Sequence, residues 1–195
     1  MKFDRNISTG LVSVAALAAA GSTAAAQNFD GTYVGMYYGA VSGDYPSTSS
    51  SEDYAFEDQT AFGVFAGKNW SASGNLTAGL EVALQTTNTY EEDSEYYLNH
   101  LTDVKFKVGT EFALSDMPVL VYGFAGVSLG SATAEDGDEP YLAIGGNLGF
   151  GADVKVSDML SVGIEHTQRE MSSHYTDDNA TVGNGTTSFR AAIHF

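Results

Sequence analysis

A two-residue alternation of mostly charged and mostly apolar side chains runs through residues 103–112. Asp103, Lys105, Lys107 and Glu111 share one parity, and the other parity holds valine, threonine and phenylalanine. Successive side chains of a β-strand point to opposite faces, so this segment is predicted to form a strand with one charged and one apolar face. A fold built from such strands must give the two faces different surroundings.

The same period recurs along the chain, and no long segment has a clean helical period. Strand-length stretches are separated by polar interruptions. The sequence predicts eight strands, near residues 31–41, 59–70, 75–86, 98–113, 118–130, 140–156, 159–170 and 185–195. The length suits a single domain.

The connections between these strands alternate in length. Three are short and rich in turn formers, at 71–74, 115–118 and 157–159. Four are long and together hold 15 acidic residues, at 42–58, 87–97, 131–139 and 171–184. An up-and-down meander places alternate connections at opposite ends. The pattern therefore predicts an eight-stranded antiparallel up-and-down transmembrane β-barrel with short periplasmic turns and four long acidic extracellular loops.

The basic residues beyond position 26 are six in number, and all fall on predicted strands. A Lys or Arg that faces lipid near the bilayer centre costs about 2–4 kcal/mol, so the two lysines of 98–113, Lys105 and Lys107, should face the lumen. We expect a lumen charge network made of Glu81, Lys105, Lys107, Glu111, Glu165, Arg169 and Arg190. The facing of 59–70, which holds Lys68, and of 118–130 stays open. Alternation alone also fits a soluble barrel with its polar face outward.

The first 26 residues differ from the rest. Lys2 and Arg5 precede an apolar, Ala-rich stretch that ends in Ala24-Ala25-Ala26, which predicts a cleaved signal peptide over 1–26 and a barrel domain over 27–195. Without residues 1–26 the chain holds 6 basic against 24 acidic residues, which disfavours nucleic-acid binding. There is no cysteine, and no later run of 18 apolar residues, so a membrane would be crossed by strands.

Several stretches resemble the eight-stranded outer-membrane barrels of Gram-negative bacteria, of the OmpA, OmpX and opacity-protein type. They are "DGTYVGMYYGAVSGDY" (30–45), "FGVFAGKNW" (62–70), "VYGFAGVSLGSA" (121–132), "LGFGADVKVSDMLSVGIEHTQRE" (148–170) and "SFRAAIHF" (188–195). The resemblance implies an outer-membrane location and contact with membrane lipids and lipopolysaccharide. It also implies that Phe195 is the signal by which the outer-membrane assembly machinery takes up the chain.

Aromatic residues near the predicted strand ends are compatible with interfacial belts. They are Tyr33, Tyr37, Trp70, Tyr122 and Phe195. An ordinary role as strand aromatics is the alternative, because strands favour aromatic residues.

The expected function is structural or surface-interacting, with no catalysis and no cofactor. One alternative is a lipid A-modifying enzyme, for which His166, or His174 beside Ser172 and Ser173, are the candidates. The other alternative is a small, low-conductance pore. Acidic stretches 91–95 and 135–139 suit weak attraction of divalent cations, but no specific metal site is expected.

Overall fold

Nine β-strands and no helix make up the described part of the chain, which in this computed structural model is residues 29–46, 53–55, 59–89, 96–134, 141–175 and 178–195. The strands are β1 (Gly31–Pro46), β2 (Asp53–Ala55), β3 (Gln59–Ser73), β4 (Leu76–Thr89), β5 (Tyr96–Leu114), β6 (Met117–Ala134), β7 (Tyr141–Lys155), β8 (Leu160–Tyr175) and β9 (Asp178–His194). The predicted signal peptide, 1–26, lies outside the described residues. So do the acidic stretches 91–95 and 135–139.

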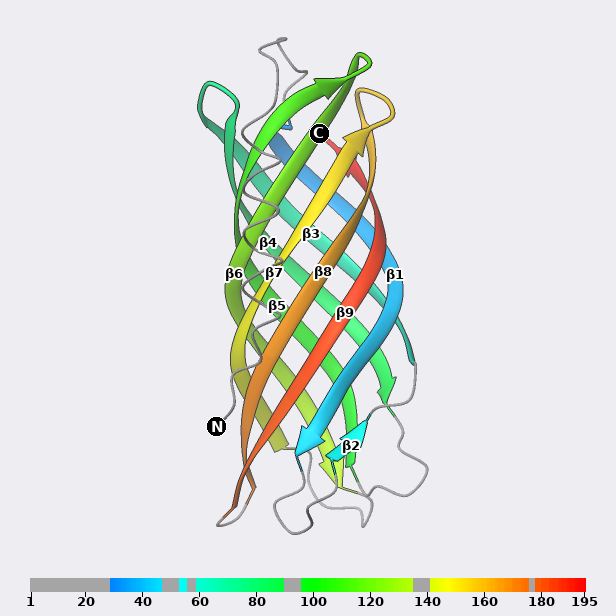
Figure 1. The fold of residues 1–195 in the computed structure, drawn as a ribbon, viewed down its shortest axis with the longest axis vertical. Coiled ribbons are helices and arrows are strands. Elements are labelled where there is room, and N and C mark those ends of the chain that lie inside the picture. The colour runs from blue at the N-terminus through cyan, green and yellow to red at the C-terminus, as the bar shows by residue number, and fades with distance from the viewer. Residues whose placement is uncertain (1–28, 47–52, 56–58, 90–95, 135–140, 176–177) are drawn as a thin grey trace.

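Eight of these strands close into a barrel (Figure 1). Each long strand pairs antiparallel with the next in sequence, and β1 pairs with β9 from Tyr33 opposite His194 to Asp44 opposite Gly183. The predicted eight-stranded antiparallel up-and-down barrel is thus confirmed. The short strand β2 was not predicted and pairs only with the last residues of β1.

Three tight turns lie at one end of the barrel, which we call the short-turn end, and Phe195 lies at the same end (Figure 1). The turn between β5 and β6 places Ser115 and Asp116 at φ angles of 49° and 70°. Positive φ at both central residues is the backbone form that matches the twist of a hairpin. Gly74, at φ 59°, begins the turn between β3 and β4. The opposite end of the barrel is called the long-loop end.

Facing alternates along each strand, with most of the large apolar side chains outside and most of the charged ones inside. On β5, Phe106 is 56% exposed, whereas Lys105 is 1% exposed. The structure also decides the strands whose facing the sequence left open. On β3, Lys68 points outward beside the ring of Trp70, and on β6, Tyr122 points inward. The barrel is therefore apolar on the outside and polar on the inside.

Three tyrosines predicted for interfacial belts instead lie inside the barrel. Tyr33, Tyr37 and Tyr122 are at most 7% exposed. Their parity matches that of the interior, and their rings lie over glycines of neighbouring strands. A Cβ at Gly63 would lie 2.2 Å from Tyr37 Cζ. The belt prediction was wrong for these three residues because a strand aromatic next to an inward glycine can fill the lumen. Trp70 and Phe195 do point outward.

Replacing Gly151 with alanine tests this packing. The new Cβ would lie 2.5 Å from Tyr122 Oη, so the ring must move, and we expect a loss of about 1–3 kcal/mol in unfolding free energy. Urea unfolding followed by the fluorescence of Trp70, the single tryptophan, measures it. Gly123→Ala is the matched control, because its Cβ meets nothing closer than 3.7 Å. Equal losses in both variants would contradict the packing role of Gly151.

Candidate functional site

Arg190 on β9 is the centre of the interior charge network. Its Nη2 lies 2.6 Å from Glu81 Oε2, and its Nη1 donates to Glu165. Its Nε lies 3.4 Å from Asp153 Oδ1. The guanidinium also stacks 4.0 Å from the centre of the Phe65 ring. One buried cation from β9 thereby joins carboxylates of β4, β7 and β8 across the barrel.

Two lysines of β5 complete this cluster. Lys105 Nζ lies 2.6 Å from Glu165 Oε1 and 3.5 Å from Glu81 Oε1. Lys107 Nζ donates to Glu81 Oε2 at 3.2 Å and lies 3.9 Å from the centre of the Tyr122 ring. Tyr122 itself donates its hydroxyl to Glu165 Oε2 at 2.9 Å. Each buried charge therefore has opposite charges or hydrogen-bond donors around it, as burial requires.

A second ion pair lies nearer the long-loop end. Arg169 on β8 binds Asp103 on β5 with two nitrogens, Nε at 3.0 Å from Oδ1 and Nη2 at 2.6 Å from Oδ2. The remaining donors of Arg169 reach Thr186 at 2.8 Å and Gln85 at 3.3 Å. Ser128 donates a further bond to Asp103 at 2.6 Å. This fork geometry fixes the guanidinium across the lumen.

At the short-turn end the interior is filled by Phe29, which is 1% exposed. Its backbone N–H donates to Glu111 Oε2 at 3.1 Å, and its carbonyl accepts from Asn69 Nδ2 at 3.3 Å. Glu111 also accepts from the Thr77 hydroxyl. Lys155 Nζ lies 5.4 Å from the centre of the Phe29 ring. Glu111 was predicted as a member of the charge network; it does face the interior, where it also holds the segment that precedes β1.

Two carboxylates of the network were not in the predicted set. Asp103 pairs with Arg169, and Asp153 faces Arg190. Parity could have indicated both, because Asp103 lies on the same face of its strand as Lys105, and Asp153 on the same face as Lys155. Among the described residues, the buried charges are five cations and five carboxylates: Lys105, Lys107, Lys155, Arg169 and Arg190 with Glu81, Asp103, Glu111, Asp153 and Glu165. The interior is therefore neutral overall, whereas the whole chain is strongly acidic.

The histidine candidates lie elsewhere. His166 is outward-facing and half-buried, and its Nδ1 lies 2.8 Å from Thr187 Oγ1. The side chain of His174 lies outside the described set. A pair that the sequence did not single out is Ser161 with His194, 2.8 Å apart inside the barrel. No described carboxylate hydrogen-bonds to either ring, so the third member of a catalytic triad is missing at both positions.

The described residues contain no group of three or more His, Cys, Asp and Glu side chains that could hold a metal ion. They also contain no helix long and apolar enough to cross a bilayer.

Comparison with known proteins decides where such a barrel operates. The sequence matches the family described as "Outer membrane protein beta-barrel domain" over residues 10–195. The chain belongs to this family. The predicted outer-membrane location is thereby confirmed, and the apolar outer face of this outer-membrane barrel contacts lipid.

Two solved structures of outer-membrane barrels share the fold. Neisserial surface protein A (NspA) is 15% identical, with a TM-score of 0.57, over 85% of this chain and 98% of that chain. Ail, the attachment invasion locus protein of Yersinia pestis, is 14% identical, with a TM-score of 0.50, over 86% and 100%. No curated protein matches the sequence. At these identities the likeness establishes the fold and nothing finer.

Proposed function

We propose that this outer-membrane barrel is a non-catalytic, non-conducting surface protein that contacts ligands or other surfaces through its long-loop end. The observation that supports this most is the filled interior. Arg190 and Lys105 bridge Glu81 and Glu165, and these four residues come from four strands. An eight-stranded barrel leaves a lumen that side chains can fill, so little room remains for an ion path.

The long connections supply the contact surface in this proposal. They hold 15 of the acidic residues, whereas the described interior is neutral. The excess charge of the chain is therefore concentrated where it can steer cationic partners. The shared fold with NspA, named as a surface protein, and with Ail, named for attachment and invasion, is compatible with such a role.

The test is adhesion of bacteria that display the protein. Residues 47–58, after β1, and 135–140, after β6, would each be replaced by a short Gly-Asn turn like the one after β3, and binding to cultured cells would be counted. We expect a severalfold loss of binding, because loops presented by a rigid scaffold carry recognition. The control replaces only the turn Ser115–Asp116 with Asn-Gly and should bind as the parent does.

Two results would contradict the proposal. One is unchanged adhesion in loop-shortened protein that still migrates on gels as a folded, heat-modifiable barrel. The other is a steady single-channel conductance of the intact protein in planar bilayers, since the proposal requires the Arg190 cluster to keep the lumen closed.

A further inference from the structure

One cation lies on the outer face of the barrel. Of the six basic residues in the described part of the chain, five are buried in the interior, and Lys68 on β3 faces outward. Its Nζ lies 5.9 Å from the centre of the Trp70 ring, and within the described residues it has no carboxylate partner. An ammonium group at the edge of a bilayer attracts an opposite charge, which at Lys68 is left to the surroundings.

The depth of Lys68 matches the headgroups of the leaflet at the short-turn end. The outward residues of β3 are apolar from Phe62 to Ala66, whereas residues 71–73, beyond Trp70, are exposed and mostly serine. Trp70 thus marks the edge of the apolar band. Lys68 lies two residues deeper, which at about 3.3 Å per residue and a tilt of about 40° is roughly 5 Å. A lysine side chain is long enough to carry its ammonium group from this depth to the headgroups.

A hydroxyl group lies beside this ammonium group. Thr32 on β1 is exposed and is the register partner of Lys68. Side chains of directly opposite strand residues lie about 5 Å apart. The backbone carbonyl of Thr32 accepts the N–H of Phe195, so the pair lies next to the seam where β1 meets β9. The ammonium and the hydroxyl together offer donors for the oxygens of one phosphate group.

An apolar hollow begins directly beneath this pair, on the side of the bilayer centre. It has a volume of about 640 Å³ and starts at Val34 and Ala66. These residues follow Thr32 and Lys68 on the same outward faces, two residues deeper along β1 and β3. A lipid whose phosphate lies on the pair can therefore place an acyl chain in the hollow without crossing a polar group.

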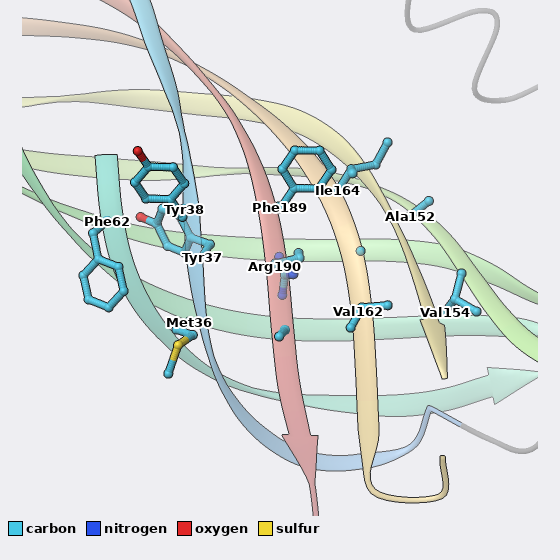
Figure 2. A pocket seen from close by; sticks show the side chains of 12 residues that line it. Met36, Tyr37, Tyr38, Phe62, Ala152, Val154, Val162, Ile164, Phe189 and Arg190 are labelled. Atoms are coloured by element: carbon cyan, nitrogen blue, oxygen red, sulfur yellow. The ribbon is translucent and has the colours of Figure 1, made fainter. Parts of the chain in front are cut away.

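A second hollow, of about 610 Å³, continues the first along the seam toward the long-loop end (Figure 2). It lies between Tyr38 on β1 and Ile164 on β8, with Phe189 of β9 beside it. Both hollows are lined by Met36 and Ala191, which are paired across the seam. The two hollows therefore form one apolar channel on the outer surface, which we call the seam furrow.

We propose that the Lys68–Thr32 pair and the seam furrow bind one glycerophospholipid of the leaflet at the short-turn end, and that this lipid covers the seam between β1 and β9. Lys68 and Thr32 hold the phosphate, and the acyl chains lie in the furrow. Asp30 is exposed two residues farther out, so a further negative charge on the headgroup gains nothing there. This site is independent of the loop contacts proposed above.

A lipid suits the furrow better than a second copy of the chain does. In a bilayer, acyl chains are as apolar as the furrow, so apolar contact alone does not drive two barrels together. The charge of Lys68 does favour a lipid, because every glycerophospholipid carries an anionic phosphate at the depth of this side chain. The phosphate contact is thus the feature that an experiment has to isolate.

Native mass spectrometry of the folded protein in detergent isolates it. The protein would be titrated with phosphatidylethanolamine, phosphatidylglycerol and diacylglycerol, all with the same acyl chains. We expect both phospholipids to bind about fivefold more tightly than diacylglycerol, which lacks the phosphate. Lys68→Gln should remove this difference and leave the binding of diacylglycerol unchanged. Lys68→Arg keeps the charge and should keep the difference.

The furrow is tested by filling the place where its two hollows meet. Ala191→Phe should weaken the binding of all three lipids, because the new ring occupies the space of an acyl chain. Ala125→Phe makes the same change on the outward face of β6, outside both hollows, and is the matched control that should change none. If Ala191→Phe does not fold, Lys68→Gln still tests the site, since Lys68 is an exposed residue.

Coverage of the seam has a readout of its own. Added phosphatidylethanolamine should raise the temperature at which the folded band disappears from gels, and should do so less in Lys68→Gln. The proposal is overturned if diacylglycerol binds as tightly as the phospholipids, if Lys68→Gln keeps the difference, or if Ala125→Phe has the effect of Ala191→Phe. It is also overturned if lipid-free protein is a dimer that Ala191→Phe dissociates, because a second copy would then occupy the furrow.

Discussion

Replacing Arg190 with glutamine is expected to lower the free energy of unfolding by about 3–5 kcal/mol. Arg190 is 5% exposed and contacts Glu81, Glu165 and Asp153, so its removal leaves these three carboxylates with only Lys105 and Lys107 as the cations of their cluster. Urea unfolding of the protein in lipid vesicles, followed by Trp70 fluorescence, would measure the change.

The control is Lys68→Gln, which removes the outward cation of β3. Lys68 is exposed and its described contact is with the Trp70 ring, so we expect a change of no more than about 1 kcal/mol. A variant that combines Arg190→Gln with Glu165→Gln should recover part of the loss, because it removes one of the unpaired charges. If Arg190→Gln costs no more than Lys68→Gln, the interior network does not stabilise the barrel.

Replacing Phe106 with arginine is expected to cost about 2–4 kcal/mol. Phe106 is exposed in the middle of β5, between Lys105 and Lys107, which face the interior. Phe106→Arg would place a positive charge against the acyl chains, whereas the positive charges of Lys105 and Lys107 lie inside the barrel. Refolding yield and urea unfolding in vesicles both report the effect.

The control for Phe106→Arg is the same substitution at a position near the edge of the bilayer. Leu76 is also exposed, but it begins β4 directly after the turn Gly74–Asn75. Near the edge of the bilayer an arginine costs only about 0–1 kcal/mol, since its side chain can reach the headgroups. Leu76→Arg should therefore be well tolerated. Equal costs at the two positions would argue against a lipid-facing surface at Phe106.

The facing of the strands was predictable wherever one parity carried charge. Lys105 and Lys107 determine the facing of β5, because two cations on one face of a membrane-spanning strand must point into the lumen. The parity of Arg190 determines β9 in the same way. On β3 the one charged residue, Lys68, faces outward, and aromatic residues occur on both faces. On β6 there is no charged residue at all. Tyr33, Tyr37 and Tyr122 show why such residues mislead, since an inward glycine on the next strand gives a ring room inside.

The partners within the network could not be predicted from one sequence. Parity places Asp103 and Arg169 in the lumen, but their pairing depends on the register of every strand between β5 and β8. Phe29 is a similar case, because its position depends on the hydrogen bonds of its backbone with Glu111 and Asn69, which come from different strands. The outward pair His166–Thr187 could not be predicted from spacing either, because its members meet only through the register of β8 and β9.

The seam between β1 and β9 has a consequence for biogenesis. These strands come from opposite ends of the described sequence, so during synthesis β1 exists long before its second neighbour. Until β9 has been made, the backbone N–H and C=O groups along that edge of β1 can pair with a strand of another polypeptide. The nascent polypeptide must therefore be kept apart from other copies of itself, and closure of the cylinder has to wait for β9, which follows all the other strands in the described sequence.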